Sequence, residues 1–296
     1  MAYFLLRLFV RCLAALPLRA ALALGRHWGR LCANVLRIRR REVLDTLGRC
    51  FPEKSPAERL AIYRGVWQNQ CLTIVEVARY MGGRVDEVAG RMEVIGQAGV
   101  QSLLDDTSRG CLVLISHLGN YPLLAFNVPR LFHRRLSFIF KEFRSPAVNR
   151  AWNELHEKAG VTGIPAKNAY RPALRALRDG DILGFMLDQN RPASEGLFVP
   201  FFGRTASTSP GLALMSYQSG CPVVPVFARR APDGHHVVEI GTPVPPPADR
   251  DKNTLLAATA RYTALLEDAI RAHPDQWLWL HRRWKSRPRD ESPPSP

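Results

Sequence analysis

A run of apolar residues at positions 112–115 is followed directly by a polar cluster that contains Ser116, His117, Gly119 and Asn120. The run is short and consists of Leu, Val and Ile, which predicts a buried strand. Open α/β sheets bind their ligands at the carboxyl ends of the strands. The pattern therefore makes His117 a candidate functional residue; the alternative is a loop histidine that caps the next helix.

Other apolar runs alternate with helical patterns along the chain. Strands are predicted at about 92–97, 111–115, 136–141, 182–187, 222–229 and 237–240, and helices at about 55–80, 147–160 and 170–178. Such alternation is typical of an α/β fold, a mostly parallel central sheet flanked by helices. The 296 residues suffice for one such domain, which we expect over residues 42–286, followed by a disordered tail at 287–296.

The first 41 residues carry nine arginines, and no acidic residue precedes Glu42. The arginines interrupt every apolar run before it reaches about 18 residues, so a membrane-spanning helix is not expected. In one continuous helix, the arginines from 7 to 30 would share roughly 140° of arc. We therefore predict that residues 1–41 form an amphipathic helical arm in a membrane interface, with its arginines on lipid phosphates. The alternative is a soluble helix packed on the domain.

The chain is strongly basic, with a net charge of +15 from 41 Lys and Arg against 26 Asp and Glu. Such an excess favours an anionic partner: nucleic acid, anionic lipid or an acidic protein. The aromatic residues are not interleaved with basic ones and no zinc-finger spacing occurs, so nucleic acid is not expected as a partner. The six cysteines form no CxxC pair, and several lie in apolar runs, which indicates reduced, buried thiols.

Polar side chains follow two further predicted strands, with Lys141 and Arg144 after one and Asp188 and Gln189 after the other. A mostly parallel sheet brings these strand ends and His117 to one edge. A neutral histidine there can deprotonate a hydroxyl as a general base. Lys141 and Arg144 can bind a phosphate or carboxylate, although for each residue alone ordinary surface charge is the stronger interpretation.

The stretch 195–211 is apolar and aromatic, yet it is interrupted by glycine and proline in a way that a core strand would not be. We predict a loop that lines an apolar ligand channel with Phe201 and Phe202. Ser207 or Thr208 would then cap the following helix. The alternative is a hairpin packed over the core.

The order and spacing of these blocks resemble the lysophospholipid acyltransferase superfamily, and within it the lipid A lauroyl and myristoyl transferases. The resemblance covers nearly the whole chain and rests on blocks at 50–53 (CFPE), 117–121 (HLGNY), 188–190 (DQN), 199–203 (VPFFG), 206–208 (AST), 222–226 (PVVPV), 274–277 (PDQW) and 279–285 (WLHRRWK). It implies a glycerolipid acyltransferase-like fold and a peripheral or monotopic enzyme on the cytoplasmic face of a bacterial inner membrane. Such an enzyme moves a fatty acyl chain from acyl carrier protein to a hydroxyl of a glycolipid, by default a lipid A-type precursor, without a metal or other cofactor.

Our mechanistic hypothesis makes His117 the general base for the acceptor hydroxyl. Backbone N–H groups near Gly119 and Asn120, together with the Asn120 side chain, would stabilise the oxyanion. Lys141, Arg144 and Arg204 would hold the acceptor phosphate or the phosphopantetheine of the carrier. The substrate-binding residues expected are Gly119, Lys141, Arg144, Gln189, Phe201, Phe202, Gly203, Arg204 and Thr208.

The chain departs from the family at one position. The family's catalytic block is His, four residues, then Asp or Glu, and the place of that acid is taken here by Pro122. A substitute acid could come from Asp188, Glu142 or Glu195, and Asp188 is the first choice because it also follows a predicted parallel strand. A purely structural role of Asp188 in a turn is the competing interpretation. Two further explanations remain open: a backbone carbonyl that fixes the imidazole, or a non-catalytic relative that binds lipid or a partner.

Overall fold

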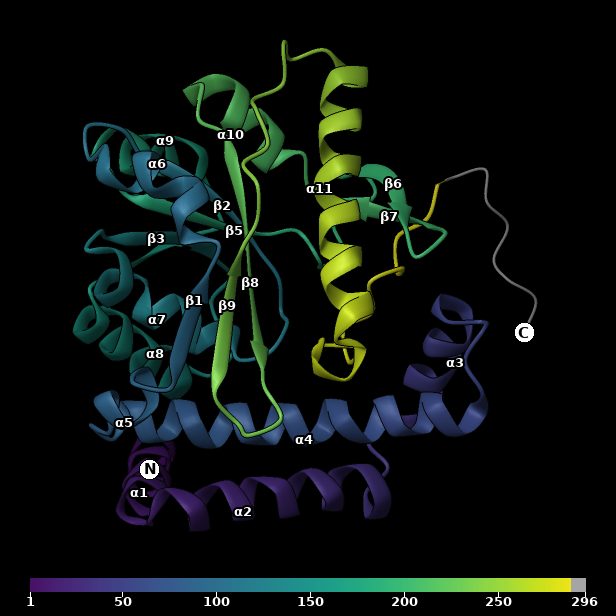
Figure 1. Ribbon diagram of the computed structural model, residues 1–296. Helices are drawn as coiled ribbons and strands as arrows, with labels where there is room; N and C mark the ends of the chain where they lie inside the picture. The colour runs from purple at the N-terminus through teal and green to yellow at the C-terminus, as the bar shows by residue number, and fades with distance from the viewer. Residues whose placement is uncertain (289–296) are drawn as a thin grey trace.

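The computed structural model describes residues 1–288, and its centre is a seven-stranded sheet with the strand order β1-β9-β8-β2-β5-β3-β4 (Figure 1). The strands are β1 (Met92–Ile95), β2 (Cys111–Ile115), β3 (Leu136–Phe140), β4 (Val161–Pro165), β5 (Ile182–Met186), β8 (Val223–Arg230) and β9 (His236–Ile240). Strands β8, β2, β5, β3 and β4 are parallel, whereas β9 is antiparallel to β8 and pairs in parallel with β1. The predicted mostly parallel sheet is confirmed. Strand β4 was not predicted, because its Gly and Pro weaken the strand pattern in the sequence; it lies at the edge of the sheet.

Helices cover both faces and one end of this sheet (Figure 1). They are α4 (Pro56–Met81), α5 (Val85–Ala89), α6 (Gln101–Asp105), α7 (Tyr121–Phe132), α8 (Pro146–Ala159), α9 (Tyr170–Arg178), α10 (Gly211–Ser219) and α11 (Lys252–Ala272). Helix α4 begins at the predicted capping box, in which Ser55 and Glu58 bond each other's backbone N–H. It then runs across the end of the sheet at which β2 finishes, as Figure 1 shows.

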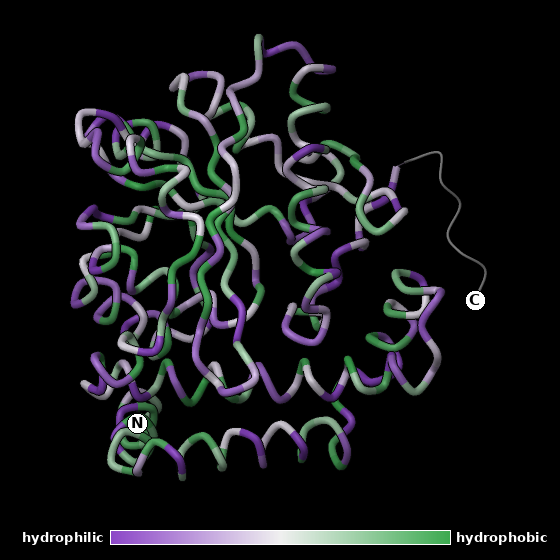
Figure 2. Tube along the Cα trace, in the orientation of Figure 1, coloured by the Kyte–Doolittle hydropathy of each residue, from purple (hydrophilic) through white to green (hydrophobic). Residues whose placement is uncertain are grey.

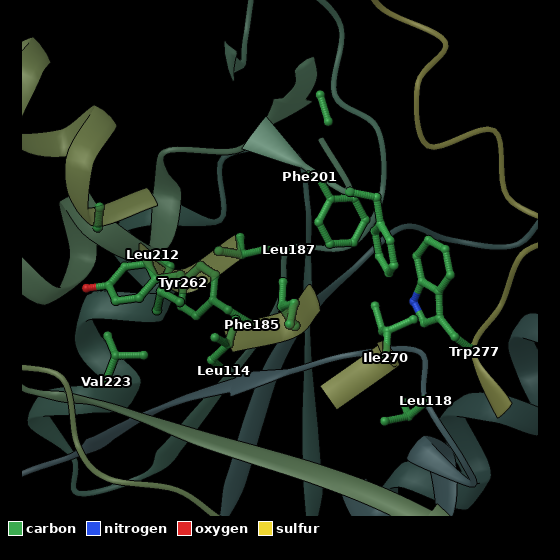
Figure 3. Packing of buried hydrophobic residues seen from close by; sticks show 14 of the residues in the cluster. Leu114, Leu118, Phe185, Leu187, Phe201, Leu212, Val223, Tyr262, Ile270 and Trp277 are labelled. Carbon is green, nitrogen blue, oxygen red and sulfur yellow. The ribbon is translucent and has the colours of Figure 1, made fainter. Parts of the chain in front are cut away.

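The side chains of β2 alternate between two apolar cores. Leu112 and Leu114 point toward α9, α10 and α11, while Val113 and Ile115 point toward α7 and α8. The first core is drawn in Figure 3, and the apolar colouring of the central strands in Figure 2 reflects burial on both faces. Such double burial explains why these strands appear in the sequence as continuous apolar runs.

The region predicted as a channel-lining loop is a hairpin, so the loop prediction was wrong and its alternative was right. Strands β6 (Leu197–Phe201) and β7 (Arg204–Thr208) pair in antiparallel register beside α11. Phe202 and Gly203 connect them, both with positive φ (53° and 65°), as a two-residue type I′ turn requires. The separate two-stranded sheet has only edges, so a proline in β6 is tolerated.

The N-terminal segment is helical but is not one continuous arm. Helix α1 (Ala2–Ala15) is separated by Leu16 and Pro17 from α2 (Leu18–Arg30), which leads into a π-helical turn (Leu31–Val35) and then α3 (Arg40–Cys50). The single arc of arginines expected for one helix therefore does not form. No helix in residues 1–288 combines the length and hydropathy needed to cross a bilayer. Positions 289–296, most of the predicted disordered tail, lie outside the described residues.

One side of α1 and α2 packs on α4. Val10, Leu13 and Ala21 are buried against Val75 of that helix and its neighbours. Arg79 of α4, 1% exposed, donates hydrogen bonds to two carbonyl oxygens at the end of α1 and forms an ion pair with Glu87. On this side of α1 and α2, the N-terminal segment therefore packs on the rest of the domain, as the alternative interpretation of the sequence expected.

Candidate active site

The side chains of His117 and Asp188 meet at the carboxyl edge of the sheet. Strands β2 and β5 are parallel neighbours, and their register aligns Ile115 with Met186, so the residues two positions later are level. His117 Nδ1 lies 2.8 Å from one Asp188 oxygen, and the backbone N–H of His117 donates to the other at 2.6 Å. Trp277 Nε1–H also donates to that second oxygen, at 2.8 Å. A carboxylate partner for His117 is thus present without an acid at position 122.

Asp188 is almost completely buried, at 1% exposure. Burial by itself raises the pKa of this carboxyl, but the charge of His117 and the hydrogen bonds from His117 and Trp277 outweigh it and lower the pKa to about 2. An ionised carboxylate only accepts hydrogen bonds, so Nδ1 of His117 carries the proton and Nε2 has the lone pair. The other two candidate acids lie elsewhere: Glu142 is exposed, and Glu195 forms an ion pair with Arg191.

The other side of the His117 ring faces polar and aromatic groups. Its Nε2 is 3.0 Å from Nε2 of Gln189, and its ring centroid is 4.7 Å from that of Tyr121. Burial, followed by the charge of Asp188, raises the pKa of Tyr121 to about 12, so this phenol is neutral. The His117 side chain keeps 13% exposure. With Nδ1 bound to Asp188, Nε2 is the ring nitrogen that is chemically suited to accept a proton once Gln189 moves aside.

The backbone after His117 is clamped by the C-terminal block around Trp277. The N–H of Gly119 donates to the carbonyl of Gln276, and the N–H of Leu278 donates to the carbonyl of His117, both at 3.2 Å. Gly119 has φ +59°, and a Cβ there would lie 2.4 Å from the carbonyl oxygen of Ala228. Only glycine fits this close approach.

A buried polar cluster lies beneath the same segment. Glu76, 2% exposed, accepts hydrogen bonds from Arg230 at 2.6 and 2.8 Å and from the Asn120 amide at 2.7 Å, and His236 lies 3.3 Å away. Burial raises the Glu76 pKa, but Arg230 and His236 outweigh it and lower the pKa to about 2. The cluster was missed because nothing local distinguishes Glu76 within α4, and its ion-pair partner is 154 residues away.

Two groups expected to stabilise an oxyanion are engaged within the protein. The Asn120 side chain is fully buried, donates to Glu76, and accepts from the N–H of Leu123 as the cap of α7. The N–H of Gly119 is bonded to Gln276. The Asn120 side chain and the Gly119 N–H therefore shape the loop after β2 in this structure.

The predicted aromatic channel is a packed aromatic core. Phe201 and Phe202 are 0% and 3% exposed, with Phe201 5.8 Å from Trp277 and Phe202 5.6 Å from Trp279 between ring centroids. Figure 3 shows Phe201 beside Trp277 inside the core. The two phenylalanines thus do not line an open channel, and Gly203 serves the turn between β6 and β7.

Thr208 neither caps α10 nor faces open solvent. Helix α10 has no side-chain cap, and Thr208 accepts a hydrogen bond from Arg283. Arg283 is fully buried and also donates to the carbonyls of Ser207 at 2.6 Å and Gln189 at 3.2 Å. Burial lowers its pKa to about 10. Arg283 thus ties the hairpin to the loop that carries Asp188, a link that the sequence did not predict.

The predicted cations are spread over the surface. Lys141 and Arg144 are exposed just beyond β3, which is separated from β2 by β5. Arg204 is partly buried at the hairpin and stacks on the Trp284 ring at 4.7 Å. The structure therefore brings Asp188 and Gln189 to His117, whereas these three cations are not in contact with it.

Comparisons with known proteins match this chain to one family of enzymes. A family model described as bacterial lipid A biosynthesis acyltransferase matches residues 1–286. The lipid A biosynthesis lauroyltransferase of Escherichia coli K12 is 26% identical over 280 residues, covering 92% of this chain and 88% of the relative. The lipid A biosynthesis myristoyltransferase of the same strain is 22% identical over 276 residues, covering 92% and 81%.

One solved structure is also similar to this chain, at a lower sequence identity. The crystal structure of the 1-acyl-sn-glycerophosphate acyltransferase PlsC from Thermotoga maritima superposes with a TM-score of 0.38 at 15% identity, covering 85% of this chain and 98% of that one. The family model spans nearly the whole chain, which confirms the resemblance noted from the sequence. The chain belongs to the bacterial lipid A biosynthesis acyltransferase family and is an acyltransferase.

Proposed function

We propose that the protein transfers a fatty acyl chain from acyl carrier protein to a hydroxyl of a lipid A-type precursor, with His117 as general base. The observation that carries this proposal is the hydrogen-bonded pair of His117 with buried Asp188. The pair holds the proton on Nδ1 and leaves Nε2 to accept another, which is the state a general base needs. The names of the relatives supply the reaction class and the acceptor.

In this mechanism the acceptor hydroxyl gives its proton to Nε2 of His117 as its oxygen attacks the carbonyl carbon of the acyl thioester. The tetrahedral intermediate then collapses, the carbon–sulfur bond breaks, and the imidazolium returns the proton to the leaving thiolate. Asp188 stabilises the imidazolium and holds its tautomer in the manner of the acid in a catalytic triad. General-base assistance of this kind contributes about 10²- to 10⁴-fold in rate.

An apolar void of about 30 Å³ lies on the α7 side of the sheet, about the volume of one water molecule and too small for an acyl chain without repacking. Its wall is entirely apolar and includes Val113 and Ile115 of β2, Leu124 of α7 and Val226 of β8. The net charge of +15 favours both an acidic carrier protein and a phosphorylated acceptor, for which Lys141, Arg144 and Arg204 are the candidate cations.

We further propose that the protein sits at the cytoplasmic face of the inner membrane as a peripheral or monotopic enzyme, attached through α1, α2 and the π-helical turn. Helix α1 exposes Phe4, Leu5, Leu8 and Phe9, and the π-helical turn with the residue after it exposes Leu31, Val35 and Leu36. Arginines on the same helices can reach anionic lipid phosphates. The apolar stretches of α1 are visible in Figure 2.

The non-catalytic alternative rested on the proline at position 122. The Asp188 carboxylate, 2.8 Å from Nδ1 of His117, supports the catalytic proposal over this alternative. The direct test is His117→Ala, assayed with acyl carrier protein thioesters and a lipid A precursor. We expect turnover to fall by about 10³-fold or more. His133→Asn, at an exposed left-handed position, is the control, and turnover of His117→Ala equal to that of the control would rule out the base role.

A further inference from the structure

The amide of Gln189 occupies the place that a reacting hydroxyl must take. Its Nε2 lies 3.0 Å from Nε2 of His117. Since Asp188 holds the imidazole proton on Nδ1, the other ring nitrogen accepts and the Gln189 amide donates. In the structure without substrate, the base is therefore capped by a side chain of its own protein.

The backbone that carries Gln189 is fixed from both sides. The Gln189 carbonyl accepts from Arg283 at 3.2 Å, and the next N–H, of Asn190, donates to Nε2 of His281 at 2.9 Å. The Gln189 side chain itself is exposed, and His117 is its only hydrogen-bond partner among the residues that the structure describes. The anchor is thus rigid, while the amide can rotate away at the cost of a single hydrogen bond.

Two of the groups expected to stabilise the oxyanion are bonded within the protein. The Asn120 amide is bonded to Glu76 and the Gly119 N–H to Gln276, so neither points toward His117. Gln189 is the side-chain amide already in contact with the base. An amide displaced from Nε2 by an incoming hydroxyl remains within a side-chain rotation of the carbon that this hydroxyl attacks.

We propose that Gln189 is a displaceable cap of His117 that becomes the oxyanion donor during acyl transfer. This inference rests on the proposed function. The acceptor hydroxyl replaces the amide at Nε2, and the released N–H₂ group donates to the thioester carbonyl oxygen as negative charge develops on it. No covalent bond to Gln189 forms or breaks. The cap keeps the base in its reactive tautomer until an acceptor arrives.

The capping step is tested without any turnover. Diethyl pyrocarbonate acylates unprotonated histidine nitrogens, and mass spectrometry measures the rate at His117 in the full-length, substrate-free protein. We expect Gln189→Ala to accelerate modification about fivefold, the factor expected when one net hydrogen bond is lost. Gln101→Ala, the same change at an exposed glutamine of α6, should leave the rate unchanged. An equal rate at His117 in Gln189→Ala and wild type would overturn the cap.

The donor step is tested by steady-state kinetics. We expect Gln189→Ala to lower kcat by about 10²- to 10³-fold with KM for the acyl donor nearly unchanged, as for the loss of one oxyanion donor. Gln189→Glu should lose more, because a carboxylate repels the developing oxyanion. Thermal unfolding should stay at the wild-type temperature in both, which separates this role from a structural one. A kcat of Gln189→Ala within threefold of wild type would overturn the donor role.

The modification experiment and the kinetic experiment also give different results depending on whether this inference or the proposed function is wrong. If His117→Ala kept full turnover, the general-base role would fail, and the modification rate would still decide whether Gln189 caps the imidazole. If His117→Ala were inactive while Gln189→Ala were fully active, the proposed function would stand and the donor role of Gln189 would fail.

Discussion

His117 and Asp188 are 71 residues apart in the sequence, yet Asp188 binds both the backbone N–H and the ring Nδ1 of His117. The contact exists because β2 and β5 are parallel neighbours in a register that makes the two residues level. A carboxylate from the next strand thus holds the imidazole where the family pattern has an acid five residues after the histidine. Pro122, at that position, is buried in the first turn of α7.

Replacing Asp188 with Asn should lower kcat by about 10⁴-fold, because an amide no longer enforces the Nδ1–H tautomer or stabilises the imidazolium. Steady-state turnover with an acyl carrier protein thioester measures the effect. The matched control is Asp181→Asn at the start of the same strand, where the buried carboxylate binds Arg135 and Ser137. That variant should lose stability and keep most of its turnover. Similar losses of rate in the two variants would point to a general effect on folding.

Pro122→Glu should not improve the enzyme. Asp188 already occupies Nδ1 of His117, and the new carboxylate would be placed at a buried position without a designated partner. Burial of an unpaired polar group costs about 1–3 kcal/mol or more. Denaturant unfolding and turnover, compared with Pro122→Ala, measure the two consequences. A rise in kcat above wild type would mean that Asp188 does not fully replace the family's acid.

Gly119→Ala should destabilise the protein more than Gly203→Ala. Both glycines have positive φ, so both substitutions carry backbone strain of about 1–2 kcal/mol. The added Cβ would lie 2.4 Å from the Ala228 carbonyl oxygen at position 119 and meets nothing within 4 Å at position 203. Urea unfolding should therefore separate the two by about 2 kcal/mol or more. Equal losses would show that the loop after β2 can move away from β8.

The free energy of unfolding should fall between pH 6.5 and 4 because of His156. This side chain is enclosed by Phe126, Phe138 and Trp152, and burial lowers its pKa to about 4. Below pH 6.5 the unfolded chain binds a proton there that the folded protein does not, so stability is lost as the pH falls, by up to about 3 kcal/mol.

The test compares pH-dependent denaturant unfolding of wild type with His156→Phe, which fills the same aromatic site without a titratable group. The free energy of unfolding of the variant should fall less steeply as the pH is lowered from 6.5 to 4. Other histidines with burial-lowered pKa values, His273 and His281, contribute equally to both proteins. The control His133→Asn should keep the wild-type slope. An unchanged slope in His156→Phe would mean that the folded protein admits the proton at this site.

Membrane binding should depend on the exposed side of α1. Phe4 and Leu8 are 67% and 47% exposed, and burial of two such side chains contributes about 3–5 kcal/mol. The double variant Phe4→Ser/Leu8→Ser should therefore bind anionic vesicles at least about 100-fold more weakly in a sedimentation assay. Serine at Ile95 and Tyr217, exposed on other elements, is the control, and high salt should weaken attachment only in part. Unchanged binding of the α1 variant would place the attachment elsewhere.

The α/β fold was predictable because burial on both faces of the sheet leaves apolar runs that are visible in the sequence. The hairpin at 197–208 was only the second choice, because its glycine and proline fit a two-residue turn and an isolated pair of strands as well as a loop. The break at Pro17 similarly divides what the charge pattern presents as one helix. In both segments the residue pattern was visible in the sequence, but backbone geometry decided which structure formed.

By itself, the sequence determined that a histidine follows a buried strand, that Asp188 and Gln189 follow another, and that the chain belongs with the acyltransferases. Only the tertiary structure decided which of these residues meet. The register of β2 with β5 pairs His117 with Asp188, and Trp277, 89 residues from Asp188, completes the site. Periodicity reports which residues are buried locally, whereas contacts between distant segments depend on strand order and register, which no local pattern contains.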